Sequence, residues 1–229
     1  MEAMSQARAR PVEYPESDGT PMAETDEHAE ELRAAIDTLR DHFAQQPVYV
    51  AGNNFLYWVE GDPTYAVSPD CYVVKPLDPH PRRIFRTWIE KAKPLFVLEL
   101  TSDSTRRSDL GDKMSVYRDA LQVPEYFLFD LTRDWIPDGV RGYRLVDGIY
   151  TTIEASPDGR LPSQTLGLEL GVVGRELRFF RAGARTPLLR RLEQIQAERV
   201  RVDEARARAE AAEAEVRRLR EELERLRGP

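Results

Sequence analysis

The sequence predicts a mixed α/β domain followed by a long helix that forms a coiled coil. A helical apolar pattern comes first, short strand-like runs separated by turn residues follow it, and Arg, Glu, Ala and Leu dominate from residue 188 onward. Spacings of three and four indicate helices, and short β-branched or aromatic runs bounded by Gly and Pro indicate strands. We therefore expect an acidic tail at 1–24, a globular domain at 25–185 and a coiled-coil helix at 186–229.

Composition and charge narrow the class of protein. No apolar run approaches the roughly 20 residues of a membrane-spanning helix, and the N-terminus lacks the apolar segment of a secretory signal. The single cysteine, Cys71, excludes an intrachain disulfide. Nine acidic and two basic residues in 1–31 give −7, which equals the net charge of the whole chain. We expect a cytoplasmic protein with a disordered tail and no membrane partner.

The elements of the domain are expected in the following order. Thr25 can cap a first helix whose apolar residues continue at helical spacing to Phe43, and Pro47 ends it. Strands are expected at 48–51, at 55–59 and at 65–74, where Pro69 interrupts the last. A short helix around 84–88 and a strand at 95–100 follow. An amphipathic helix is expected at 105–121, with Leu110, Met114, Tyr117 and Leu121 on its apolar face. Later strands are expected at 125–129, 141–146, 149–153, 166–170 and 177–180.

The C-terminal segment has the spacing of a coiled coil. After a phase break near Arg199, small or apolar residues recur at positions 202, 205, 209, 212, 216, 219, 223 and 226. This pattern favours a homodimer held by the helix. The alternative is a single solvated helix stabilised by Glu–Arg pairs one turn apart.

Two acidic residues stand out in strand-like surroundings. Glu99 lies inside the most apolar run of the chain, where an ionised carboxylate is costly unless it is paired. Asp70 follows Pro69 inside a β-rich run. The alternatives are a strand-end glutamate that reaches solvent and an aspartate in a simple turn. Acids on neighbouring strands, with the Leu100 carbonyl, can instead bind Mg²⁺ through oxygen ligands.

A polar loop and a helix follow Glu99. Asp109 and Lys113 are four residues apart and share one helical face. Lys113 is then expected to hold the attacking water or the scissile phosphate, and Asp109 to orient it. The alternative is a surface ion pair. Arg106 and Arg107 precede Lys113 and are candidates for contacts with DNA phosphates, although a solvated basic loop would look the same.

Four motifs in this order resemble the Uma-type family of putative bacterial restriction endonucleases, within the PD-(D/E)XK superfamily. They are Ser68-Pro69-Asp70, Phe-Val-Leu-Glu99-Leu-Thr-Ser, Ser-Thr-Arg-Arg-Ser-Asp109-x3-Lys113-x3-Tyr117 and Val123-Pro-Glu-Tyr-Phe-Leu-Phe-Asp130. The resemblance covers about residues 25–182.

The resemblance implies a restriction-endonuclease-like mixed sheet flanked by helices, and Mg²⁺-dependent cleavage of DNA in which Mn²⁺ can substitute. Asp70 matches the acid of the PD motif and Glu99 the acid of (D/E)XK. Thr101 stands where the superfamily usually has lysine, and Lys113 matches a replacement from the next helix. The leading reading is a metal-dependent endonuclease. The alternatives are a catalytically inert nuclease-fold module that binds nucleic acid or assembles partners, and an unrelated metal-binding or structural protein.

Overall fold

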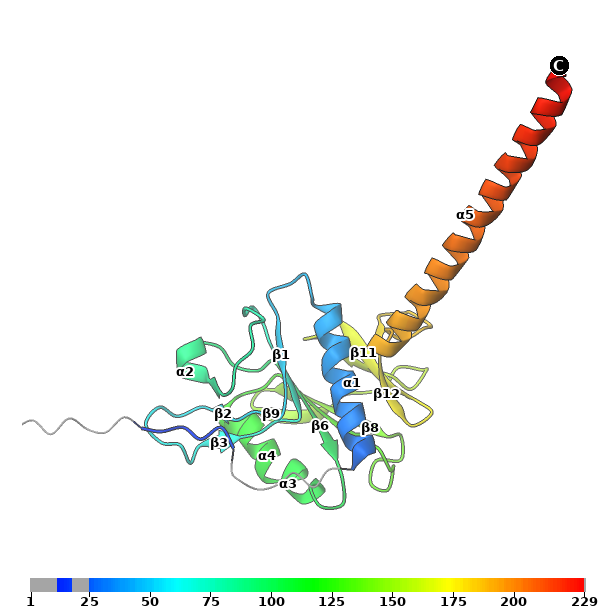
Figure 1. The fold of residues 1–229 in the computed structure, drawn as a ribbon. Coiled ribbons are helices and arrows are strands. Elements are labelled where there is room, and N and C mark those ends of the chain that lie inside the picture. Colours follow the sequence, from blue (N-terminus) through cyan, green and yellow to red (C-terminus); the bar gives the residue numbers. More distant parts are fainter. Residues whose placement is uncertain (1–11, 18–24, 229) are drawn as a thin grey trace, which may run out of the picture. The chain divides into compact units, whose positions relative to one another are not determined.

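The structure is a computed structural model that describes residues 12–17 and 25–228 (Figure 1). The chain divides into two compact units, one ending at Leu188 and the other beginning at Leu189. Most of the expected acidic tail, 1–24, lies outside the described residues. Within the described part of the chain, no helix is both long and apolar enough to cross a membrane.

A six-stranded sheet forms the centre of the first unit. Its strand order is β1-β4-β6-β7-β8-β9. Only β6 and β7 pair in parallel, and the other neighbours are antiparallel, so the sheet is mixed as expected. The strands are β1 (Tyr49–Ala51), β4 (Cys71–Val74), β6 (Phe96–Thr101), β7 (Glu125–Asp130), β8 (Val140–Val146) and β9 (Ile149–Thr152).

The two parallel strands are buried along their whole length. Continuous apolar sequence is typical of strands covered on both faces. Successive side chains point to opposite faces, so Phe96 and Leu98 join one core and Val97 joins the other. Glu99 shares its face with Val97. The sequence therefore places one carboxylate in the second core, against the helical segment that follows β6.

The first core lies between the sheet and helix α1 (Asp26–His42). The Thr25 side chain caps α1 by accepting a hydrogen bond from the His28 backbone N–H at 3.2 Å. A three-stranded antiparallel sheet also contributes to this core. Its strands are β10 (Leu161–Ser163), β11 (Leu168–Val173) and β12 (Glu176–Arg181). The sequence pattern did not indicate a strand at β10.

The expected strand at 65–74 is two strands in different sheets. Pro69 has no backbone N–H to contribute to a ladder, and the chain turns there before β4 begins at Cys71. The first part pairs in a small separate sheet of order β3-β2-β5. The remaining elements of this region are β2 (Leu56–Tyr57), β3 (Ala66–Val67), β5 (Phe85–Arg86) and the short helix α2 (Thr87–Glu90).

The expected helix at 105–121 is divided into three pieces. They are α3 (Arg106–Leu110), α4 (Asp112–Ser115) and a π-helical turn η1 (Val116–Ala120). Gly111 interrupts the helix with a non-helical backbone conformation. Because of this break, Leu110 is 47% exposed, and its predicted place on the buried face is wrong. Tyr117 and Leu121 are fully buried, as predicted.

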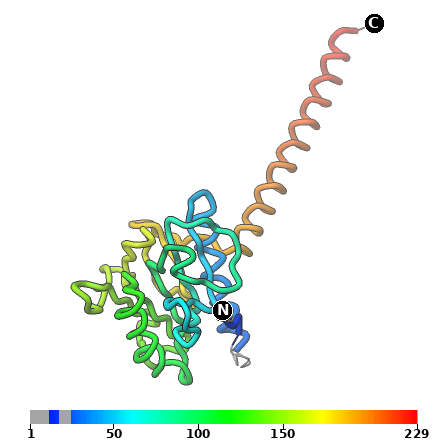
Figure 2. The backbone as a smooth tube through the Cα atoms, turned by 90° about the vertical axis from the view of Figure 1, so that its left-hand side faces the viewer, coloured from blue at the N-terminus to red at the C-terminus, as the bar shows by residue number. Residues whose placement is uncertain are grey.

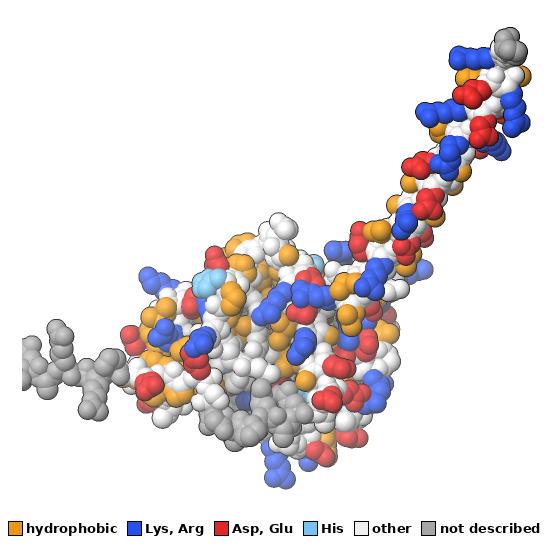
Figure 3. Space-filling view, viewed as in Figure 1, with side chains coloured by type: hydrophobic (Ala, Val, Ile, Leu, Met, Phe, Trp, Pro, Cys, Tyr) orange, Lys and Arg blue, Asp and Glu red, His pale blue; other side chains and the backbone are white. Residues whose placement is uncertain are grey.

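The second unit is a single helix, α5 (Arg191–Arg227), continuous in both views (Figure 1 and Figure 2). Hydrophobic side chains alternate with acidic and basic ones along it (Figure 3). The helix starts later than the expected residue 186. Leu188 instead packs against the core of the first unit, and its N–H donates to the Phe179 carbonyl at 2.7 Å.

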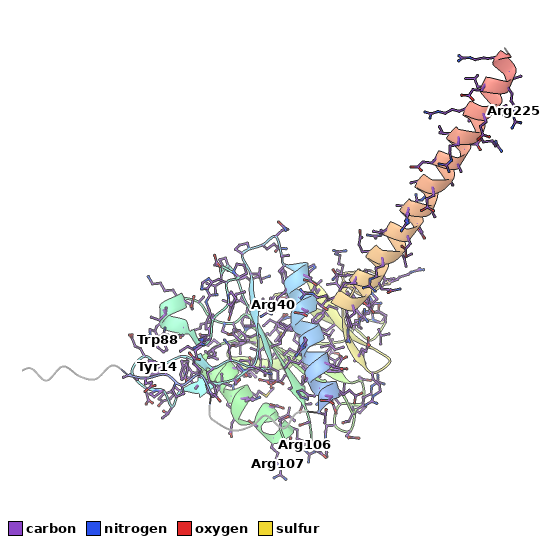
Figure 4. All side chains as sticks on the ribbon, viewed as in Figure 1. Tyr14, Arg40, Trp88, Arg106, Arg107 and Arg225 are labelled. Atoms are coloured by element: carbon purple, nitrogen blue, oxygen red, sulfur yellow. The ribbon has the colours of Figure 1, made fainter. Side chains whose placement is uncertain are left out.

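Residues 12–17 lie against the small sheet and α2. The Tyr14 ring is 5.1 Å from the Tyr57 ring and 5.3 Å from the Trp88 ring (Figure 4). The Glu16 carboxylate pairs with Arg83 at 3.1 Å. This short part of the tail, for which the sequence predicts disorder, therefore makes defined contacts with the domain.

Candidate active site

Glu99 is held in the interior by two side chains from the segment after β6. Its side chain is 0% exposed. Oε1 accepts a hydrogen bond from the Tyr117 hydroxyl at 2.5 Å, and Oε2 accepts one from the Lys113 ammonium at 2.9 Å. Glu99 is therefore a paired buried carboxylate, which excludes the alternative of a strand-end glutamate that reaches solvent.

Asp70 lies directly beside Glu99, at the turn that leads into β4. Its Oδ2 accepts a hydrogen bond from the Leu100 N–H at 2.7 Å, and its own N–H donates to Glu99 Oε2 at 3.3 Å. A Cβ atom added at Gly52 would lie 1.8 Å from the Asp70 carbonyl oxygen. Only glycine at position 52 allows this close approach. The pairing of β4 with β6 thus brings the two predicted acids together.

Lys113 and Asp109 remain one turn apart although Gly111 separates their helices. The Lys113 ammonium lies 3.1 Å from Asp109 Oδ1 as well as 2.9 Å from Glu99 Oε2. The Tyr126 hydroxyl donates to the Asp109 backbone carbonyl at 2.8 Å, which fixes the end of α3. Asp109 is buried, so the pair is not the surface ion pair that the sequence left open.

Burial and like charges govern the electrostatics of this cluster. Burial raises the pKa of Glu99 well above its usual range, and the neighbouring Asp70 charge raises it further. Burial likewise raises the pKa of Asp70. Burial alone would lower the pKa of Lys113, but the Glu99 and Asp109 carboxylates outweigh it and raise that pKa. When all three carboxyl groups are ionised, the single ammonium group leaves the cluster with an excess of negative charge, which a bound cation would offset.

A pocket of about 260 Å³ opens on the Asp70 side of the cluster. Glu99 lies beneath it, and Asp70, Leu100 and Lys113 form part of its wall. Thr101 is buried in the wall, where its hydroxyl has no hydrogen-bond partner among the described residues. The other lining residues are Thr25, His28, Ser102, Asp103, Ser104, Thr105, Leu131, Thr132 and Asp134.

The oxygen donors at this pocket suit Mg²⁺. The Leu100 N–H donates to Asp70, so it points to the edge of β6 that faces Asp70. In a strand, the C=O of a residue points to the same side as its N–H. The Leu100 carbonyl therefore also faces Asp70. Among the described residues, no group of three or more His, Cys, Asp or Glu side chains could hold a metal by itself. Mg²⁺ is usually bound by one or two carboxylates, completed by other oxygens, waters and substrate phosphate. Asp70, Glu99 and the Leu100 carbonyl match that donor set.

The two arginines predicted to bind nucleic acid lie outside the pocket lining. The Arg106 guanidinium stacks on the Trp135 ring, 3.2 Å from its centroid. Trp135 in turn donates a hydrogen bond to Asp103 at the pocket rim, at 3.1 Å. Arg107 is exposed and projects from α3 (Figure 4). Arg107 is therefore free to meet a phosphate backbone, whereas Arg106 is partly committed to Trp135.

Three contributors to the site were not among the predicted site residues. Tyr117 lies four residues after Lys113, so the spacing places it on the helical face of Asp109 and Lys113, but no role in the site was predicted for it. His28 lies 4.0 Å from Asp70 Oδ2. Asp130 shapes the pocket wall by accepting hydrogen bonds from the backbone N–H groups of Thr132, Arg133, Trp135 and Ile136. An aspartate at a strand end before Leu-Thr-Arg-Asp is a recognisable turn signal.

Comparison with known proteins places this chain in a family. A family model described as "Uma2: Putative restriction endonuclease" matches residues 1–178, more than half of the chain. A solved structure, described as a putative nuclease belonging to DUF820 from Anabaena variabilis, is similar with a TM-score of 0.47 and 14% identity over 65% of this chain and 79% of that chain. No curated protein matches the sequence. The match of the family model shows that the chain belongs to the Uma2 family of putative restriction endonucleases.

Proposed function

We propose that the protein is a metal-dependent endonuclease that hydrolyses phosphodiester bonds in DNA, with Mg²⁺ as its cofactor and Mn²⁺ as a substitute. Family membership supports a nuclease. The observation that carries the proposal is the buried cluster of Asp70, Glu99 and Lys113 at the wall of an open pocket.

Each residue has a role that follows from its position. Asp70, Glu99 and the Leu100 carbonyl would hold Mg²⁺, which polarises the phosphate and activates water when it is bound. Lys113 keeps its proton at neutral pH because of the neighbouring carboxylates, so it acts as a fixed positive charge toward the attacking water or the scissile phosphate. Asp109 positions Lys113 through their ion pair.

The threonine at position 101 does not remove the ammonium group from the site. A lysine at position 101 would extend from β6. Lys113 instead extends from α4, and its ammonium lies 2.9 Å from Glu99 Oε2. What the chemistry requires is a positive charge beside the acid pair, and the element that supplies it is free to differ. Lys113 also lines the pocket.

One observation favours the second candidate, an inert nuclease-fold module. Both Glu99 oxygens already accept hydrogen bonds, from Tyr117 and Lys113, and the side chain has no exposed surface. In a catalytically inert protein the cluster would serve only to stabilise the fold, and the pocket would bind nucleic acid without cleaving it.

A plasmid cleavage assay separates the two candidates. Supercoiled DNA is incubated with the full chain and Mg²⁺, Mn²⁺ or a chelator, and matched RNA serves as a second substrate. We expect metal-dependent nicking that falls at least about a hundredfold in Asp70→Asn and in Lys113→Met, the loss typical of removing a group that stabilises a transition state. The control is Asp112→Asn, an exposed acid beside Lys113.

Three results would decide against the proposal. DNA that is bound but never cut, with either metal, would support the inert module. Cleavage of RNA alone would refute the assignment of DNA as substrate. Equal activity of wild type and Asp70→Asn would show that the nuclease site lies elsewhere.

A further inference from the structure

Helix α5 carries a regular apolar seam whose side chains are exposed. Within the described residues, none of its side chains is buried. Val216, Leu219 and Leu223 are 46%, 51% and 50% exposed. The seam repeats every seven residues, with Val202, Ala209, Val216 and Leu223 at the a positions of a heptad. Ala205, Ala212, Leu219 and Leu226 stand at the d positions.

One heptad of the seam favours two strands. Val216 at a with Leu219 at d is the combination typical of parallel dimeric coiled coils. Alanine in the middle of the seam lets two helices approach closely but buries little apolar surface. One heptad before Ala205, the d position is occupied by Glu198. The seam therefore begins at Val202.

The charges beside the seam select one orientation. In a parallel pair in register, each g residue faces the e residue of the other chain five positions later. Arg208 then faces the partner's Glu213, Glu215 faces the partner's Arg220, and Glu222 faces the partner's Arg227. All three contacts join opposite charges, and the twofold symmetry makes each of them twice.

The antiparallel arrangement lacks this complementarity. With the same seam residues in contact, e positions face e positions and g positions face g positions. Arg206 then meets the partner's Arg220, and Glu213 and Glu215 each meet their own copies. Among these contacts, only Arg208 meets an opposite charge, the partner's Glu222. Like charges at these positions oppose pairing. The ion pairs within one helix, such as Arg206 with Glu210 at 2.9 Å, do not distinguish the orientations.

We propose that α5 pairs in parallel and in register with a second copy of the chain over residues 202–227. Each chain enters α5 at its N-terminal end, so this pairing attaches both domains to the same end of the coiled coil. An antiparallel pair would place the N-terminal ends of the two paired segments about 40 Å apart, at 1.5 Å per helical residue. Where the proposed nuclease function holds, the parallel pair supplies two active sites for one duplex.

Sedimentation equilibrium of the full chain tests the charge argument. The variants are Glu215→Arg, Arg220→Glu and the double exchange of both residues. We expect a dimer in the wild type, a dissociation constant weakened about tenfold in each single variant, and recovery to within about threefold of wild type in the double variant. A wild type that stays monomeric at every concentration, or a double variant no tighter than the singles, would overturn the proposal.

Disulfide formation tests the orientation directly. Ala205→Cys and Leu226→Cys place one thiol near each end of the seam, and the native Cys71 is buried in the domain. In a parallel pair, each variant oxidises to a linked dimer by itself, while wild type does not. Linkage that appears only when Val202→Cys is mixed with Leu226→Cys would show an antiparallel pair. Neither readout depends on nuclease activity, so the dimer and the enzyme can fail separately.

Discussion

Replacing Asp70 by asparagine should make the metal-free protein more stable and abolish its response to Mg²⁺. Asparagine keeps the shape and an oxygen that can accept the Leu100 N–H. The substitution removes the Asp70 carboxylate, whose ionisation is opposed by burial and whose negative charge repels that of Glu99. It also removes one of the two proposed carboxylate ligands.

The size of both effects can be worked out. Replacing a buried ion pair with neutral groups of similar volume stabilises a protein by about 1–4 kcal/mol, and we expect about 1–2 kcal/mol for the single carboxylate of Asp70. A domain of this length gains about 2–4 °C in melting temperature per kcal/mol, which gives about 2–8 °C. In the wild type, metal at 100 times its Kd adds about 2.7 kcal/mol. A site weakened a hundredfold adds only about 0.4 kcal/mol at the same concentration.

Thermal unfolding of chelated protein, with and without Mg²⁺, measures both effects, and Asp112→Asn is the control. The pKa of Asp70 is raised in the folded state, so its ionisation costs stability as pH rises through the interval above the usual aspartate range. The advantage of the variant should therefore vanish in acid, where both proteins are neutral at this position. An unchanged or lower metal-free melting temperature, or an equal Mg²⁺ response in both proteins, would refute the reasoning.

Two further predictions concern a structural carboxylate and DNA binding. Buried Glu125 accepts hydrogen bonds from Ser163, Gln164, Thr165 and Arg144, so Glu125→Gln should lower the free energy of unfolding by about 2–4 kcal/mol in urea. Burial opposes ionisation of Glu125, but these hydrogen bonds outweigh burial and lower its pKa. The loss of stability in Glu125→Gln should therefore shrink as pH falls below the usual glutamate range. The exposed control Glu154→Gln should stay within about 0.5 kcal/mol of wild type. Arg107→Ala should reduce the salt dependence of DNA binding by about one phosphate contact, and an unchanged slope in a salt titration would place the DNA elsewhere.

The site could be predicted largely because burial and charge conflict in the sequence itself. Glu99 stands in an apolar strand, where an unpaired carboxylate is too costly to retain, so a partner had to exist. Helical spacing then placed Lys113 and Asp109 on one face, and that relation survives the break at Gly111. The identity of the second partner, Tyr117, depended on how η1 packs on β6, which the sequence pattern does not encode.

The errors have physical causes of the same kind. The spacing of apolar residues continued through Gly111, so the pattern gave no sign that Leu110 would turn outward. The strand expected at 65–74 is divided at Pro69, because proline cannot donate to a ladder and the chain turns there. Leu188 fitted the helical pattern of α5 but packs on the domain, because tertiary contacts rather than periodicity decide which unit a boundary residue joins.

In the proposed enzyme, the Asp70–Glu99 pair holds the catalytic metal. Anomalous scattering from crystals of the full chain grown with Mn²⁺ would locate that metal. We expect a peak in direct contact with the Asp70 carboxylate and the Leu100 carbonyl, on the pocket side of Glu99. In Asp70→Asn we expect no peak there. An ion held by other residues, or no ion at the pair while Mn²⁺ supports cleavage, would contradict this assignment.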